Sequence, residues 1–137
     1  MIIVSACLAG VQCRYDGAGK PCEAVICLVA VGKAIPVCPE QLGGLTTPRL
    51  SSEIRGDRVV RKDGVDVTEE FERGAHEALR LAQLVGAKAA ILKSRSPSCG
   101  VGKIYDGTFS GKVVDGDGVF TALCRKNGIE VKTEEEL

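Results

Sequence analysis

Three cysteines of this sequence, Cys7, Cys38 and Cys99, stand where thiol side chains can do metal chemistry. Each follows, by one to seven residues, a short apolar run with the composition of a buried parallel strand. Because the carboxyl ends of parallel strands lie at one edge of a sheet, loops from three such strands can bring three distant thiolates together. These loops also carry charged and hydroxyl side chains, a setting that simple burial of cysteine explains poorly. We therefore expect one site built by three loops.

The residue types available favour iron and sulfur over zinc. No CxxC pair is present, and the only histidine, His76, lies in the middle of an expected helix, away from the cysteine loops. Ligation by thiolates alone favours an iron–sulfur cluster. Three cysteines on a four-iron cluster leave one iron open, and an open iron is a Lewis acid, which indicates catalysis rather than electron transfer alone.

Two other classes of protein stay open at this point. A zinc- or iron–sulfur-binding protein without catalysis, structural or regulatory, would need a fourth ligand, for which Cys13 is the candidate. A metal-free thiol protein would instead use reactive cysteines. The remaining cysteines lie in apolar helical patterns and are expected to be small buried hydrophobes: Cys22, Cys27 and Cys124.

The elements that must position the cysteines alternate between strands and helices. The expected strands are Met1–Ala6, Ala34–Val37, Ala89–Leu92 and Ile129–Val131. The expected helices span about residues 21–32, 67–85 and 118–127. Three β-like runs within residues 53–67 predict a meander, whereas residues 100–115 show no regular element. This order predicts a single α/β domain over residues 1–137, a small three-layer α/β/α domain with a mainly parallel, Rossmann-like sheet and a short β-meander insertion.

Three finer expectations follow from local patterns. The helix at residues 21–32 has so many apolar positions that it should be buried on more than one side. Asp66 and Asp117 should cap the two later helices. The acidic run Glu134–Glu136 should be a solvated tail.

Composition and charge exclude several partners. The 137 residues are 45% apolar and 26% charged, as in an ordinary globular protein. With 18 basic and 18 acidic residues the net charge is zero, so we expect neither nucleic acid nor an anionic membrane as partner. No apolar run suits a signal peptide or a membrane span, which predicts a cytoplasmic protein. Seven cysteines, an odd number, then favour metal or thiol chemistry over disulfides.

Several short motifs together resemble the bacterial family long filed as domain of unknown function 523, which includes the thiouracil desulfidases. The matching segments are Ser5–Gly10, Cys13–Gly17, Pro36–Glu40, Thr47–Arg49 and Lys93–Gly100. The resemblance covers essentially the whole chain, although Ala9 stands where a larger aliphatic residue is common. It implies a [4Fe-4S] cluster held by Cys7, Cys38 and Cys99, whose fourth iron accepts sulfur from a small thiolated nucleobase and releases it as hydrosulfide.

Polar residues in the same motifs are candidates for the rest of the chemistry. Glu40 is the expected acid–base group, unless it is only a solvated or helix-terminal carboxylate. Ser96 and Ser98 are expected to donate hydrogen bonds to the substrate, with capping of backbone amides as the alternative. The candidates for substrate binding, unless they only pair with each other or offset cluster charge, are Arg14, Asp16, Arg49 and Lys93.

Overall fold

A four-stranded parallel sheet forms the centre of the computed structural model, which describes residues 1–137. Its strands are β1 (Ile2–Ser5), β2 (Ala34–Val37), β5 (Ala89–Leu92) and β8 (Glu130–Thr133). They lie in the order β2-β1-β5-β8, and each neighbouring pair is parallel. The sheet order places β1, the first strand of the chain, between the two other strands that precede cysteine loops. The sheet is parallel, as the alternation of strands and helices predicts.

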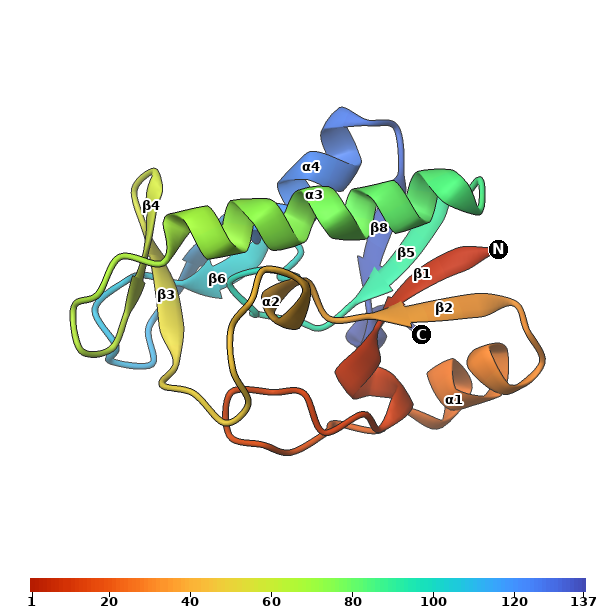
Figure 1. Ribbon diagram of the computed structural model, residues 1–137, viewed down its shortest axis with the longest axis horizontal. Coiled ribbons are helices and arrows are strands. Elements are labelled where there is room, and N and C mark those ends of the chain that lie inside the picture. The colour runs from red at the N-terminus through yellow and green to blue at the C-terminus, as the bar shows by residue number, and fades with distance from the viewer.

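Helices cover both faces of this sheet (Figure 1). They are α1 (Glu23–Ala30), α2 (Pro39–Leu42), α3 (Thr68–Leu84) and α4 (Val119–Lys126). Ile3 packs in one core with the residues of α3 and α4, whereas the next residue, Val4, packs with Val25 of α1 in a second core. Successive side chains of a strand point to opposite faces, so this alternation explains the two cores. The three-layer α/β/α arrangement is confirmed.

None of the helices has both the length and the apolar character needed to cross a membrane.

Two small antiparallel hairpins stand beside the main sheet (Figure 1). The first pairs β3 (Ser52–Arg55) with β4 (Arg58–Arg61), and a single bridge between Val60 and Asp66 is all that remains of the third run of the expected meander. The second pairs β6 (Lys103–Tyr105) with β7 (Val113–Asp115), in a stretch for which no element was expected. Its strands have three residues each, too few for a periodic pattern to show.

The structure corrects the expectation for the first helix. Only Val25 of α1 is buried, so the helix covers the sheet with one side and leaves Ile26 at 39% exposure. Cys27 is exposed and Cys22 is half-buried, so neither is the buried hydrophobe that the pattern predicted. Cys124 on α4 is fully buried, as predicted. The apolar content of α1 misled because a short peripheral helix can carry exposed apolar residues without cost to the fold.

The helix caps also differ from the prediction. Asp66 accepts a hydrogen bond from the Thr68 backbone N–H at 2.9 Å, but the N-cap residue of α3 is Val67, and no side chain caps this helix. Asp117 does not cap α4: Gly118 precedes the helix, and Asp117 accepts from Gly102 N–H at 2.8 Å instead. A Cβ atom on Gly118 would lie 2.5 Å from the Ser98 carbonyl oxygen, so only glycine lets α4 start this close to the Cys99 loop.

The short helix α2 is positioned by direct backbone contact with α3. A Cβ atom on Gly74 of α3 would lie 1.8 Å from the Pro39 carbonyl oxygen, and one on Gly43 would lie 1.9 Å from the Glu70 carbonyl oxygen. Two glycines therefore allow the two helices to touch through their main chains. This contact fixes the first turn of α2, which carries Glu40.

Candidate functional site

A cavity of about 470 Å³ opens at the carboxyl edge of the sheet, and its lining includes Cys7, Cys13, Cys38 and Cys99. Cys7 lies in the 3₁₀ turn η1 (Ala6–Ala9) directly after β1, and Cys38 precedes the first turn of α2, directly after β2. Cys99 lies in the loop after β5. Because β2, β1 and β5 are neighbours in the sheet, their loops converge on one pocket.

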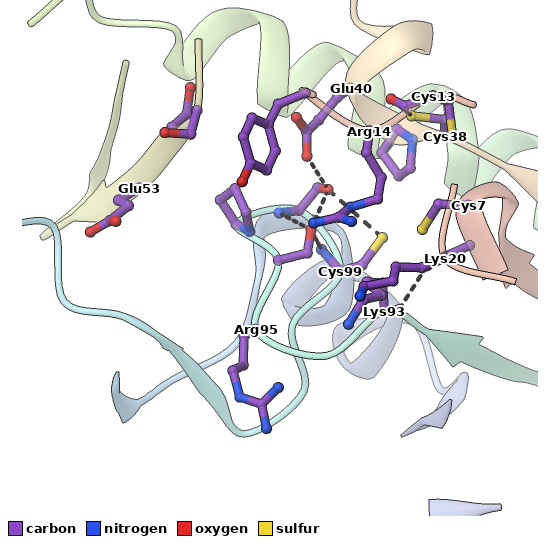
Figure 2. Close-up of a pocket in the computed structure, with 18 of the residues that line it drawn as sticks. Cys7, Cys13, Arg14, Lys20, Cys38, Glu40, Glu53, Lys93, Arg95 and Cys99 are labelled. Atoms are coloured by element: carbon purple, nitrogen blue, oxygen red, sulfur yellow. Dashed lines mark hydrogen bonds between the residues drawn. The ribbon is translucent and has the colours of Figure 1, made fainter. Parts of the chain in front are cut away.

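The four thiols differ in burial and in the residues that lie next to them. Cys7 and Cys99 are 7% and 3% exposed, and Figure 2 shows their sulfur atoms facing the same space. Cys13 is 2% exposed and lies beside Cys38, whose Sγ atom is 3.8 Å from the Cys13 carbonyl oxygen. The structure thus gathers the three expected ligands in one pocket, together with Cys13.

Burial and neighbouring charge shift the acidity of these thiols in opposite directions. Burial, followed by the charge of Cys38, raises the pKa of Cys7 to about 11, although Lys93 and Arg14 oppose that rise. Burial also raises the pKa of Cys99. The pKa of Cys38 is lowered to about 7, chiefly by a hydrogen bond from the Cys13 thiol, with help from the Gln41 backbone N–H. Two of the three thiols therefore need a cationic ligand to become thiolates at neutral pH.

The arrangement fits a cluster better than a single metal ion. No group of three or more His, Cys, Asp or Glu side chains lies close enough to hold one ion. A cluster binds each cysteine through a different iron, so its ligands lie farther apart than the ligands of a mononuclear site. The soft, all-thiolate donor set of the pocket, with cations nearby to offset negative charge, suits an iron–sulfur cluster. The zinc alternative with Cys13 as fourth ligand finds no support in this geometry.

Glu40 is held in the pocket wall by Arg49. The Arg49 Nε and Nη2 atoms lie 3.1 and 3.0 Å from Glu40 Oε1, and the two side chains are only 8% and 14% exposed. Arg49 also donates to the carbonyl oxygens of Cys13 and Thr46, both at 3.0 Å, and to Thr47 Oγ1 at 2.9 Å. Arg49 therefore holds Glu40 and the Cys13 loop in place at the cavity wall, and its assignment to substrate binding stays a prediction.

A chain of hydroxyl groups leads to the other oxygen of Glu40. Ser98 Oγ lies 2.9 Å from Glu40 Oε2, and Ser96 Oγ lies 3.0 Å from Ser98 Oγ. Ser96 Oγ also accepts from the backbone N–H groups of Ser98 and Cys99, at 3.2 and 3.0 Å. Since those amides occupy its acceptor sites, the Ser96 hydroxyl donates to Ser98, which donates to Glu40. Ser96 thus caps the Cys99 turn, one of the two roles weighed for it from the sequence.

Lys93 pairs with an acid that the sequence placed in a solvated tail. Its Nζ atom lies 2.8 Å from Glu134 Oε2, and the two side chains are each 17% exposed. The expectation for Glu134 was wrong because β8 ends at the same edge of the sheet as the cysteine loops. Burial alone would raise the pKa of Glu134, but hydrogen bonds from Lys93 and the Ser94 N–H outweigh it and keep that pKa below its ordinary value.

The first loop contributes Arg14 to the cavity lining, but not Asp16. The two form a long ion pair, with Arg14 Nη1 3.6 Å from Asp16 Oδ2, and Arg14 also stacks over the Tyr15 ring. Asp16 pairs with Arg14 but does not line the cavity, so its assignment to substrate binding stays a prediction.

The wall opposite the cysteines comes from the two hairpins, which the sequence did not connect with the site. Glu53 on β3 accepts from the Gly107 and Phe109 backbone N–H groups, at 3.0 and 3.1 Å, and so ties the β6–β7 loop to the first hairpin. Figure 2 places Glu53 across the cavity from Cys7. The lining residues that the motifs did not reveal include Lys20, Glu53, Lys62, Tyr105 and Phe109. The only sequence signal that could have pointed to any of them is the charge of Glu53 and Lys62 within the predicted β-meander.

Comparison with known proteins agrees with this geometry. The family model of 2-thiouracil desulfurase matches residues 2–136. A Bacillus subtilis (strain 168) relative, the uncharacterized protein YbbK, is 46% identical over 147 aligned positions, which cover all of this chain and 97% of that protein. A solved structure, the [4Fe-4S]-dependent thiouracil desulfidase TudS, superposes with a TM-score of 0.95 at 49% identity, over 99% of this chain and 91% of that one. The chain belongs to the 2-thiouracil desulfurase family.

Proposed function

We propose that this protein is a [4Fe-4S]-dependent desulfidase that removes sulfur from a thiolated nucleobase of the thiouracil type. The observation that carries the proposal is the meeting of three cysteines from neighbouring parallel strands with a carboxylate and two hydroxyl groups in one cavity. The names of the family model and of the matched structure support the same substrate class. The overall reaction consumes one water, replaces C=S by C=O and releases hydrosulfide, without a change of redox state.

The proposed ligands of the cluster are Cys7, Cys38 and Cys99. When bound, such a cluster supplies an iron with a vacant coordination position, a Lewis acid for the thiocarbonyl sulfur. A single domain over residues 1–137 that presents all three cysteines at one edge of its sheet needs no second subunit to complete this ligand set.

Glu40 is the proposed general base for the attacking water. Arg49 fixes one carboxylate oxygen, and the other faces Ser98 Oγ at 2.9 Å. Once protonated, Glu40 can donate to Ser98 Oγ, and the Ser98 hydroxyl can then turn to pass its own proton to the departing sulfur. We assign Arg49 to orientation of Glu40, and propose that Arg14 and Lys93, two cavity-lining cations whose charges act on Cys7, face the substrate.

Anaerobic reconstitution with iron and sulfide tests the proposal directly. The loaded protein should turn brown, with broad absorption near about 400 nm from thiolate-to-iron charge transfer, and should release sulfide from 2- or 4-thiouracil. Replacing Cys38 by Ser should remove the absorption, whereas Cys27→Ser, at an exposed position outside the pocket, should leave it unchanged. A protein that binds the full cluster yet releases no sulfide from either base would refute the desulfidase assignment.

Substitution of Glu40 separates the cluster from the chemistry. Glu40→Gln keeps the shape of the side chain and its bonds to Arg49, so cluster content should stay at the wild-type level while turnover falls by about 100-fold or more. Unimpaired turnover would remove Glu40 from the reaction.

A non-catalytic metal-binding protein is the second candidate, favoured by one observation. Cys13 lies against Cys38 within the cavity and could act as a fourth ligand that closes the cluster. Cys13→Ser distinguishes the two: an unchanged cluster spectrum supports the open, catalytic form, and loss of the cluster supports the closed form.

A further inference from the structure

The C-terminal turn closes on the loop that carries Cys99. The strand β8 ends at Thr133, and the 3₁₀ turn η2 (Glu134–Glu136) follows at once. A capping box orders this turn: the Thr133 hydroxyl accepts from the Glu135 N–H at 3.2 Å, and Glu136 accepts from the Thr133 N–H at 3.2 Å. A preformed turn, rather than a mobile chain end, therefore presents Glu134 to the site.

The Glu134 carboxylate accepts three hydrogen bonds from two consecutive residues of that loop. Lys93 Nζ lies 2.8 Å away, the Ser94 backbone N–H 2.9 Å and the Ser94 hydroxyl 3.1 Å. Because both charged side chains are only 17% exposed, loss of either partner leaves a charge that is poorly solvated and uncompensated.

Lys93 is fixed from both ends. Its backbone N–H donates to Ser5 Oγ at 2.9 Å, at the end of the neighbouring strand β1. Its ammonium group is shared between Glu134 and Ser94 Oγ, the latter at 2.8 Å. The side chain lines the cysteine cavity, and Figure 2 shows it below Cys7 and Cys99.

We propose that Glu134 is a positioning residue that acts through Lys93: it holds the Lys93 ammonium at the cavity and balances its charge beside Cys7 and Cys99. The C-terminal turn is then a working part of the site, although it carries no metal ligand. The part of this inference that concerns the cluster rests on the proposed function. The reduction potential of an iron–sulfur cluster depends on the net charge around it, so the pair should influence that potential.

The first test measures the midpoint potential of the reconstituted cluster. Glu134→Gln leaves the Lys93 charge unbalanced and should shift the potential upward at unchanged cluster content. Glu135→Gln is the matched control: it breaks an ion pair of the same turn with Arg95, whose side chains are 42% and 54% exposed, and should cause no shift. The double variant Lys93→Met/Glu134→Gln should return to the wild-type value. The same midpoint potential for Glu134→Gln and Glu135→Gln would overturn the proposal. So would a Glu134→Gln shift that is equally large in the wild-type protein and in the Lys93→Met background.

The second test needs neither cluster nor turnover, so it stands even if the desulfidase assignment fails. In cluster-free protein, Glu134→Ala should speed hydrogen exchange of the Ser94 amide by about tenfold or more, since its buried charged acceptor is lost. Glu135→Ala should leave that rate unchanged. Equal protection in the two variants would show that Glu134 does not hold the loop. Thermal unfolding of both variants confirms that the comparison is made between folded proteins.

Discussion

The molecule uses the same ionic chemistry in two regions with different results. At the cysteine rim, the ion pairs Arg49–Glu40 and Lys93–Glu134 have side chains between 8% and 17% exposed. On the hairpins the pairs are open to solvent, with exposures of 34–88%: Arg58–Asp66, Arg61–Asp63 and Lys103–Asp115. Exposed pairs contribute about 0.2–1 kcal/mol, whereas removal of one partner of a buried pair costs about 3–5 kcal/mol. Burial therefore decides which pairs organise the protein.

The difference also concerns what each pair connects. Arg49 links Glu40 to the carbonyl oxygen of Cys13, so it joins the second cysteine loop to the first. Glu134 links the C-terminal turn to the loop after β5. The hairpin pairs instead join residues of one arm to each other. The ion pairs at the cysteine rim thus hold separate segments of the chain in place around the site. The hairpin pairs only connect residues within one hairpin segment.

The largest contrast should come from removing one arginine in each region. Arg49→Met leaves Glu40 buried without its partner and strips the donor from two carbonyl oxygens, so the free energy of unfolding should fall by about 3–5 kcal/mol. Arg58→Met on β4 should cost less than about 1 kcal/mol. Urea unfolding followed by circular dichroism measures both. Similar losses would refute the distinction between the two kinds of pair.

A second contrast concerns the backbone contact beneath Glu40. Gly74→Ala places a methyl group 1.8 Å from the Pro39 carbonyl oxygen, so α2 must move away from α3. We expect a loss of about 1–3 kcal/mol from overpacking, although alanine is the better helix former by about 1 kcal/mol. Arg80→Ala, at a side chain 68% exposed on the same helix, should be nearly neutral. A Gly74→Ala protein as stable as the wild type would show that α2 is free to shift.

The pH dependence of stability should reveal the Lys93–Glu134 pair. The folded protein holds the pKa of Glu134 below its ordinary value of 4.5. A carboxyl group with a lowered pKa stabilises the fold above its unfolded pKa and loses that contribution as the pH falls through its folded pKa. The wild type should therefore be more stable than Glu134→Gln at pH 7, and the difference should shrink below pH 4.5. A difference that is constant from pH 7 to pH 3 would contradict this account.

The smallest effect is expected at the second hairpin. Lys103→Met breaks the pair with Asp115, whose side chain is 88% exposed, and should change the free energy of unfolding by less than about 0.5 kcal/mol. High salt should leave even that difference undetectable, because it screens surface charges. A loss above about 2 kcal/mol would mean that this hairpin is held by its ion pair rather than by its backbone ladder.

Regular periodicity made the main sheet and α3 predictable. The apolar runs of β1 and β5 are buried except at their first residues, the run of β2 at the sheet edge is buried at Ala34 and Val37, and the stripe of α3 includes Phe71, Ala75 and Ala78, all at most 1% exposed. Such patterns indicate burial directly, because a buried strand is a continuous apolar run and the buried side of a helix has apolar residues at regular intervals of three or four. The second hairpin and the true start of α4 escaped because three-residue strands and glycine turns carry no period.

By itself, the sequence determined the strand order along the chain, the three cysteine loops that follow β1, β2 and β5, and the motifs shared with the family. These are local properties, because each depends on residues that are close together in the sequence. Only the tertiary structure decided that Arg49 holds Glu40, that Glu134 pairs with Lys93, and that Glu53 ties two hairpins into the far wall. Each of these contacts depends on where separate segments come to rest in the packed chain. A partner chosen in that way leaves no spacing signal, because a charged side chain looks the same in the sequence whether it is solvated or buried against its counterion.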